Sequence, residues 1–227
     1  MSPTRPKVAF IHATMAAAGP ITAAVQQEMP DAVLWHLLDD RLQEDALQDG
    51  MSTTLHERML NLIDHAVTGG ADAVQLTCSM YASVAATARQ QWDLPIFGPD
   101  EALQQAVRAY GAQEVRVLFS WPQACEDGTQ RMKDAMAPTT LAVRGVVAEG
   151  AATAVANHDE QHLLEALAEA AGDREDGVVI ALGQYSLSPV SAALAQRLGM
   201  PVLTGPALAA QQLRRSLNSR PASVTSL

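Results

Sequence analysis

Cys78 is the residue of this 227-residue chain best placed to act as a nucleophile or an acid/base group. It lies in the segment LTCS, between an apolar run and an amphipathic stretch. A thiol at the start of a helix is near the partial positive charge of the helix N-terminus, which favours the thiolate. Thr77 and Ser79 flank it with hydroxyl groups that can bind a carboxylate. We expect Cys78 to be catalytic, with a buried structural thiol as the alternative.

A second polar group, in the segment LGQYS, follows another apolar run about 106 residues later. Gln184 can donate and accept hydrogen bonds, but its amide cannot exchange a proton at neutral pH. We therefore expect Gln184, Tyr185 and Ser186 to bind or orient a substrate. Ser120, at the end of the apolar run 114 to 119, is expected to line the same site.

Three further side chains are candidates at the site. Thr14, after the first apolar run, is expected to contact substrate. His12 ends that run and could be a second acid or base, although a histidine in a strand can also be a satisfied core group. Tyr185 is the other candidate for a second acid or base. Cys125 falls inside an expected helix over 123 to 136, and whether it reaches the site stays open.

Signals of cofactor or metal binding are weak. His158 and His162 stand four residues apart, but Asp159 replaces the glutamate of the zinc motif, so we expect a solvated helix turn and no metal. The sequence contains no G-x-G-x-x-G, P-loop or G-x-S-x-G pattern. The two lysines, Lys7 and Lys133, fall at a strand start and within a helix, which argues against a Schiff base with pyridoxal phosphate.

Composition limits the partners. The formal charge of −10 and the pI near 4.9 argue against nucleic acid or an anionic membrane surface, and no apolar run is long enough to span a bilayer. The two cysteines fit neither a disulfide framework nor a zinc site, so free thiols in the cytoplasm are expected. The expected partner is a small molecule, with a homodimer as the default assembly.

Short apolar runs alternate with amphipathic stretches, which predicts an α/β protein with parallel sheets. The predicted strands are 7 to 12, 32 to 37, 72 to 77, 95 to 97, 114 to 119, 140 to 147, 177 to 182 and 201 to 203. Helices are predicted over 80 to 92, 123 to 136 and 158 to 171, and around Leu55 to Ala66. Thr54 with Glu57, and Asn157 with Glu160, are the expected capping pairs.

The chain also repeats itself at a shift of about 106 residues. Segment 76 to 97 aligns without a gap on segment 182 to 203, so that strand end, helix and next strand recur in step. The repeat predicts two Rossmann-like lobes related by a pseudo-twofold axis, each a four-stranded parallel sheet with helices on both faces. The predicted divisions are a first lobe over 1–105, a second over 106–205, a C-terminal helix 206–217 that packs back on the first lobe, and a frayed tail 218–227. A site is expected in the cleft at the carboxyl ends of the strands, where Cys78 and Gln184 occupy matching positions.

With LTCS and LGQYS at matching strand ends, followed by PIFGPDEA and PVLTGP, the chain resembles the aspartate/glutamate/hydantoin racemase superfamily over residues 7 to 215. The resemblance implies a carboxylate substrate held between two lobes, no metal or organic cofactor, and a cysteine from each lobe that removes or returns a proton. It implies a catalytic role for Cys78 and carboxylate binding by Thr77 and Ser79. Gln184 stands where the family has its second cysteine.

This departure favours one-sided chemistry, either decarboxylation or isomerisation through a thiol adduct, over racemisation by two thiols. Arylmalonate decarboxylase, a single-cysteine relative, keeps the second thiol rather than the first, so its activity is not carried over directly. Racemisation with His12 or Tyr185 as a substitute partner stays open. A carboxylate-binding sensor without turnover and a metal-dependent hydrolase are the other hypotheses.

Overall fold

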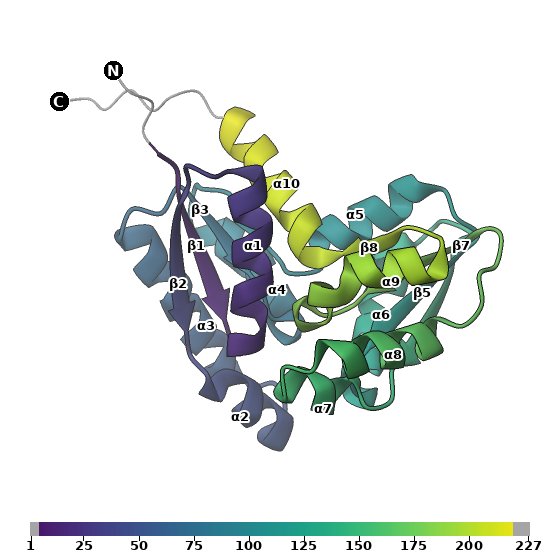
Figure 1. Ribbon diagram of the computed structural model, residues 1–227. Coiled ribbons are helices and arrows are strands. Elements are labelled where there is room, and N and C mark those ends of the chain that lie inside the picture. Colours follow the sequence, from purple (N-terminus) through teal and green to yellow (C-terminus); the bar gives the residue numbers. More distant parts are fainter. Residues whose placement is uncertain (1–4, 220–227) are drawn as a thin grey trace. The chain divides into compact units, whose positions relative to one another are not determined.

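The computed structural model describes residues 5–219 and contains two four-stranded parallel sheets, each with helices on both faces (Figure 1). The first sheet has the order β2-β1-β3-β4, formed by β1 (Lys7–His12), β2 (Val33–Leu38), β3 (Ala73–Leu76) and β4 (Ile96–Phe97). The second has the order β6-β5-β7-β8, formed by β5 (Glu114–Phe119), β6 (Ala142–Val147), β7 (Val178–Leu182) and β8 (Val202–Thr204). The two orders are the same, element for element. The predicted α/β class is confirmed, and the predicted strands are present with ends displaced by at most two residues.

The helices follow the strands in a regular way. In the first half they are η1 (Met15–Ala17), α1 (Ala18–Glu28), α2 (Arg41–Asp49), α3 (Thr53–Thr68), η2 (Ser79–Tyr81) and α4 (Ala82–Gln91), where η marks a 3₁₀ helix. In the second half they are α5 (Glu101–Tyr110), α6 (Pro122–Met136), α7 (Ala151–Ala156), α8 (Glu160–Ala171), η3 (Tyr185–Val190), α9 (Ser191–Leu198) and α10 (Gly205–Ser219). No helix within residues 5–219 has the length and apolar character needed to cross a bilayer.

The chain divides into two compact units. One contains the described residues up to Pro99 and from Ala209 onward, and the other runs from Asp100 to Leu208. Most of α10 therefore groups with the first unit, where Arg214 forms an ion pair with Glu28 of α1. The tail expected over 218–227 lies outside the described residues except for its first two, which belong to α10.

Alternation along the strands builds the core of each unit. In the first unit, Ile11 and Leu76 pack with α3 and α4. Phe10 and His12 lie on the opposite face, where both rings contact His36, which in turn contacts Thr22 of α1. In the second unit, Leu118 packs with α7, α8 and α9, and its neighbour Phe119 packs with α5 and α6. Both faces of each sheet are therefore covered, and the polar strand-end residues come at the carboxyl edge.

Two of the expected capping residues are wrong. The N-cap of α3 is Ser52, whose hydroxyl accepts from the backbone N–H of Leu55 at 3.3 Å, rather than Thr54. The N-cap of α8 is Asp159, whose carboxylate accepts from the N–H of His162 at 3.0 Å, rather than Asn157. α3 begins earlier than periodicity alone indicates, and α8 begins later. In each helix the Ser or Asp side chain just before the actual first turn is therefore the N-cap.

Candidate active site

Cys78 lies between the end of β3 and the start of η2, with an extended backbone conformation (φ −109°, ψ 118°) and only 8% exposure. Its carbonyl accepts from the N–H of Tyr81 at 3.1 Å, which closes the turn into η2 and α4. The predicted helix over 80 to 92 therefore exists, but a 3₁₀ turn precedes its α-helical part. The thiol is held at the carboxyl edge of the sheet rather than within a helix.

Tyr81 belongs to the same core cluster as Cys78. Tyr81 is fully buried, and its hydroxyl donates to the carbonyl of Leu42 at 2.8 Å. Burial raises the pKa of Tyr81 to about 12, and a negative charge on Cys78 contributes to the same rise. Tyr81 therefore stays protonated near neutral pH, and its buried side chain is held in place at the Cys78 turn by the hydrogen bond to Leu42.

Thr77 joins the Cys78 turn to β1. Its backbone N–H donates to the carbonyl of Ile11 at 3.1 Å, and its hydroxyl lies 3.2 Å from the same carbonyl. The hydroxyl also lies 2.8 Å from Nδ1 of His12, which is 1% exposed. These contacts occupy the Thr77 side chain, so it positions the turn instead of presenting a free hydroxyl to a ligand.

His12 is paired with a second histidine. Its Nε2 lies 2.9 Å from Nδ1 of His36 on β2, and the two rings stack with centroids 5.2 Å apart. Burial, and then the neighbouring His36, lower the pKa of His12 to about 4. Both ring nitrogens of His12 are occupied by partners, which weakens the expectation that it exchanges protons with substrate directly.

Ser79 and Thr14 keep hydrogen-bonding capacity at this edge. Ser79 is partly buried, and its hydroxyl forms no hydrogen bond within residues 5–219. Thr14 is the N-cap of η1, where its hydroxyl oxygen accepts from the N–H of Ala16 at 3.4 Å and its proton stays free to donate. Both residues follow the carboxyl ends of adjacent strands, β3 and β1.

Gln184 occupies the corresponding place in the second unit, between β7 and η3, and is tied to Ser120 at the end of β5. Its Oε1 accepts from the backbone N–H of Ser120 at 2.7 Å and from the Ser120 hydroxyl at 2.9 Å. Because a backbone N–H can only donate, these bonds fix the orientation of the amide. The two N–H groups of Nε2 stay without a partner within residues 5–219.

Tyr185 does not have the properties expected of an acid or base. It is 5% exposed, its hydroxyl has no hydrogen-bond partner within residues 5–219, and burial raises its pKa far above the usual value, with Asp100 and Glu101 adding to the rise. Its ring packs against Gly205. Ser186, by contrast, is partly buried.

Cys125 lies apart from this group. Its Sγ is 3.9 Å from the hydroxyl of Thr129, and it lines an open groove of about 590 Å³ between α6 and β6. The groove is walled by Val143, Arg144 and Gly145, which belong to the first four residues of β6. Ser120 and Gln184 follow the carboxyl ends of β5 and β7, whereas the groove with Cys125 lies beside the middle of the edge strand β6.

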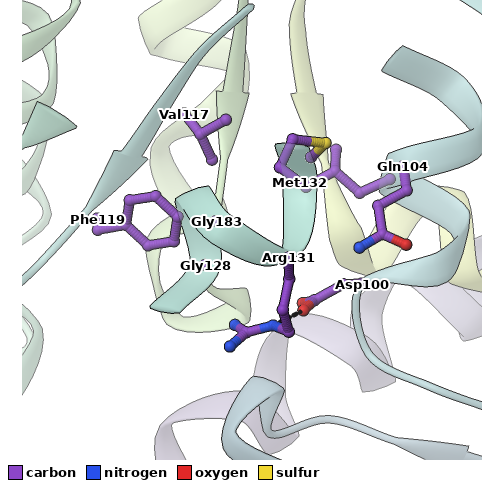
Figure 2. A pocket seen from close by; sticks show the side chains of 9 residues that line it. Asp100, Gln104, Val117, Phe119, Gly128, Arg131, Met132 and Gly183 are labelled. Carbon is purple, nitrogen blue, oxygen red and sulfur yellow. Dashed lines mark hydrogen bonds and ion pairs between the residues drawn. The ribbon is translucent and has the colours of Figure 1, made fainter. Parts of the chain in front are cut away.

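Sequence reasoning missed an ion pair in the second unit. Arg131 of α6 donates from Nε to Asp100, the N-cap residue of α5, at 2.8 Å beside a cavity of about 10 Å³ (Figure 2). Burial raises the pKa of Asp100, and Arg131 opposes that rise. The cavity is also lined by Phe119 and Gly183, and it has room for one water molecule but not for a substrate.

His158 and His162, which were expected on a solvated helix turn, lie at the capped start of α8. His162 lies 2.5 Å through Nδ1 from Asp159, the N-cap residue of the same helix, and His158 has a left-handed φ of 54° before that cap. Within residues 5–219, no group of three or more His, Cys, Asp or Glu side chains is arranged to hold a metal ion.

The comparisons with known proteins identify solved structures of similar fold and no match in sequence. No protein-family model matches the sequence, and no curated protein matches it. Among solved structures, glutamate racemase from Bacillus anthracis matches with a TM-score of 0.71 at 13% identity, covering 95% of this chain and 82% of that one. A putative Asp/Glu racemase from Yersinia pestis matches with a TM-score of 0.70 at 14% identity, covering 94% and 100%. The chain has the Asp/Glu racemase fold.

Arylmalonate decarboxylase shares the Asp/Glu racemase fold with this chain, with a TM-score of 0.63 at 19% identity over 95% of this chain and 94% of that one. The same architecture therefore contains proteins named for racemisation and for decarboxylation. At these identities the likeness establishes the Asp/Glu racemase fold, and the chemistry depends on the side chains at the strand ends.

Proposed function

We propose that this chain is an enzyme of the Asp/Glu racemase superfamily that acts, without a cofactor, on the carbon next to a carboxylate of a small acid, with Cys78 as the acid/base or nucleophile. The observation that carries the proposal is a nearly buried thiol between β3 and η2, at the carboxyl edge of a parallel sheet with this fold. Ligands of open α/β sheets bind at that edge.

The asymmetry between the units favours one-sided chemistry. Gln184 matches Cys78 in its place after the third strand, and its amide cannot take or give a proton at neutral pH. In a decarboxylation, the bond to the departing carboxylate breaks, CO₂ leaves and the electron pair stays on the α-carbon as an enolate. Cys78 then gives its proton to that carbon, and the resulting thiolate regains a proton from solvent. In an isomerisation, the same thiolate adds to a double bond and later leaves.

Each unit, taken by itself, offers groups with unused donors for a carboxylate. In the first unit these are the Ser79 and Thr14 hydroxyls, and in the second the Nε2 group of Gln184; each has a proton that no protein group accepts within residues 5–219. Hydrogen bonds to a carboxylate or to the developing enolate are stronger than neutral ones, and they stabilise charge that forms during the reaction. Ser120 supports Gln184, and Ser186 is the remaining hydroxyl candidate.

Two alternatives have weaker support. A racemase would need a substitute for the second thiol, but His12 has both ring nitrogens engaged and Tyr185 is buried with a raised pKa. A carboxylate-binding protein without turnover is favoured by Gln184 alone, since the amide keeps hydrogen bonding and gives up proton exchange. An ordinary pKa of Cys78, near 8.5, combined with tight carboxylate binding would support that alternative.

The proposal is tested by incubating the purified chain with amino acids, hydantoins, substituted malonates and maleate in deuterated water. Release of CO₂, double-bond isomerisation or incorporation of deuterium at the α-carbon is the expected result for at least one class. Tight binding of an acid with none of these reactions would favour the sensor. The expected partner is a small carboxylate, and the free thiols favour a cytoplasmic location.

A further inference from the structure

We infer that His12 and His36 form a pair that holds one exchangeable proton and positions Thr77, the residue before Cys78. The inference rests on the proposed function, because it assigns positioning residues to that site. The pair joins a ring with 1% exposure to an exposed ring at the sheet edge, on the face of the sheet covered by α1. Neither histidine belongs to the groups that would contact substrate.

The pair is the centre of a continuous chain of five contacts. From one end to the other they join Ile11 O to Thr77 Oγ1 (3.2 Å), Thr77 Oγ1 to His12 Nδ1 (2.8 Å), His12 Nε2 to His36 Nδ1 (2.9 Å), His36 Nε2 to Thr22 Oγ1 (3.2 Å), and Thr22 Oγ1 to Ala18 O (2.8 Å). The chain begins beside Cys78 and ends on α1.

The protons in this chain can be counted. Each of the five contacts needs one proton, whereas two threonine hydroxyls and two neutral imidazoles supply only four. One added proton on the pair completes all five hydrogen bonds. A second added proton would place an N–H of His12 directly against an N–H of His36. The geometry therefore has a place for one extra proton and not for two.

In the neutral pair the incomplete contact lies at one end or the other. If it is at the Thr77 end, Thr77 donates to His12, and Ile11 O keeps only the backbone N–H of Thr77. If it is at the Thr22 end, Thr77 accepts from His12 and donates to Ile11 O. A missing proton at the Thr77 end leaves Ile11 O satisfied by the Thr77 backbone N–H, whereas a missing proton between the two rings would leave two ring-nitrogen lone pairs facing each other. Whether the Thr77 hydroxyl donates to His12 or to Ile11 O is therefore coupled to the direction in which the hydroxyl of Thr22, on α1, donates.

Burial and the surrounding charges place proton uptake by the His12–His36 pair below the ordinary histidine pKa of 6.5. The titratable side chains of the surrounding elements are Lys7 of β1, Glu28 of α1, Asp31 before β2, Asp39 and Asp40 after β2, Asp72 before β3, Cys78 after β3, and Arg214 and Arg215 of α10. Glu28 forms an ion pair with Arg214, and Asp39 with Arg58, so these carboxylates are already neutralised. Burial lowers the pKa of both His12 and His36, while the fifth hydrogen bond favours the proton. Protonation from solvent enters at the exposed His36.

The test uses the full chain and needs no substrate. Imidazole ¹⁵N resonances and backbone amide resonances are recorded from pH 8 down to about pH 3, beyond the pKa of about 4 for His12, for wild type, Thr22→Val and Thr22→Ser. In wild type we expect His12 and His36 to titrate together with uptake of a single proton, and the Thr77 and Cys78 amides to shift with the same midpoint. Thr22→Val should lower that midpoint and change the chemical shifts of the His12 ring, because His36 loses its acceptor. Thr22→Ser keeps the hydroxyl and should leave the midpoint and the His12 shifts as in wild type.

Two results would overturn the inference. One is independent titration of the two rings, each taking up its own proton. The other is a His12 ring and a Thr77 amide that do not respond to Thr22→Val in a variant whose thermal unfolding is unchanged. Loss of the proposed activity in Cys78→Ala, together with either result, would remove the positioning role and leave the proposed function standing. If the two rings instead titrate together and respond to Thr22→Val, while Cys78→Ala keeps full activity, the histidine pair stands and the catalytic role of Cys78 is removed.

Discussion

Cys78 and Gln184 occupy the same place in the two units: each follows the third strand of its unit and is the N-cap residue of a 3₁₀ helix, with similar extended backbone angles. The sheets around them have the same strand order. Only the side chains differ, a thiol in one unit and an amide in the other. The duplication is thus preserved in the backbone, while at this position only the first unit has a side chain that can lose a proton near neutral pH.

Gln184 can be tested for its donor groups separately from its structural bond. Gln184→Glu keeps oxygen acceptors for the N–H and hydroxyl of Ser120 but removes the two N–H donors and adds a negative charge. We expect KM for a carboxylate substrate to rise by about tenfold or more, since one charge-assisted hydrogen bond contributes about 1.5 to 3 kcal/mol. Steady-state kinetics measure this, and thermal unfolding serves as the control for the fold. An unchanged KM would remove Gln184 from the binding site.

Gly183 is a packing requirement directly before Gln184. A Cβ at this position would overlap the ring of Phe119, which is buried in the core between β5, α5 and α6. We expect Gly183→Ala to reduce the free energy of unfolding by about 1 to 3 kcal/mol through overpacking. Denaturant unfolding gives this value. The matched control is Gly183→Ala combined with Phe119→Leu, which should cost less than the sum of the two single changes. Additive costs would show that the ring is not the obstacle.

His12 should make stability depend on pH. Its pKa is near 6.5 when unfolded and about 4 when folded, so the unfolded chain holds more protons between these values. Stability from this group is complete above pH 6.5 and is lost as the pH falls toward 4, by about 3 kcal/mol at most. Denaturant unfolding at several pH values measures the slope. His12→Gln should flatten the slope between pH 4 and pH 6.5. His162→Gln should leave the slope well below pH 6.5 unchanged, because Asp159 raises the pKa of His162 and that ring is protonated there in both the folded and the unfolded chain. An equal slope in His12→Gln would contradict the assignment.

Sequence patterns predicted the strands well because the central strands are short continuous apolar runs: β1, β3, β5 and β7 are buried along almost their whole length. Strands 7 to 12 and 114 to 119 match to the residue, and strand 140 to 147 differs because its first two positions precede the pairing of Ala142 with Glu114. Capping residues were harder, since a helix can begin at any of several nearby polar side chains. The left-handed φ of 54° at His158, which shifts the start of α8, has no clear signal in sequence.

The contacts of the candidate site depend on register, which the sequence does not state. His12 and His36 were both visible as residues near strand ends, yet they meet only because β1 and β2 pair in parallel with Phe10 opposite His36. In the same way, Ser120 and Gln184 meet through the pairing of β5 with β7. Asp100 and Arg131 had no motif to mark them, since their ion pair joins the starting cap of one helix to the third turn of the next.

The thiol of Cys78 carries the central claim, and its removal is the most direct test. Deuterium incorporation, isomerisation or CO₂ release should be measured for wild type, Cys78→Ala and Cys125→Ala on the acid that the substrate panel identifies. We predict at least a hundredfold loss in Cys78→Ala, in line with the contribution of a positioned proton donor, and near wild-type turnover in Cys125→Ala. Full activity of Cys78→Ala, with a fold unchanged by thermal unfolding, would contradict the account.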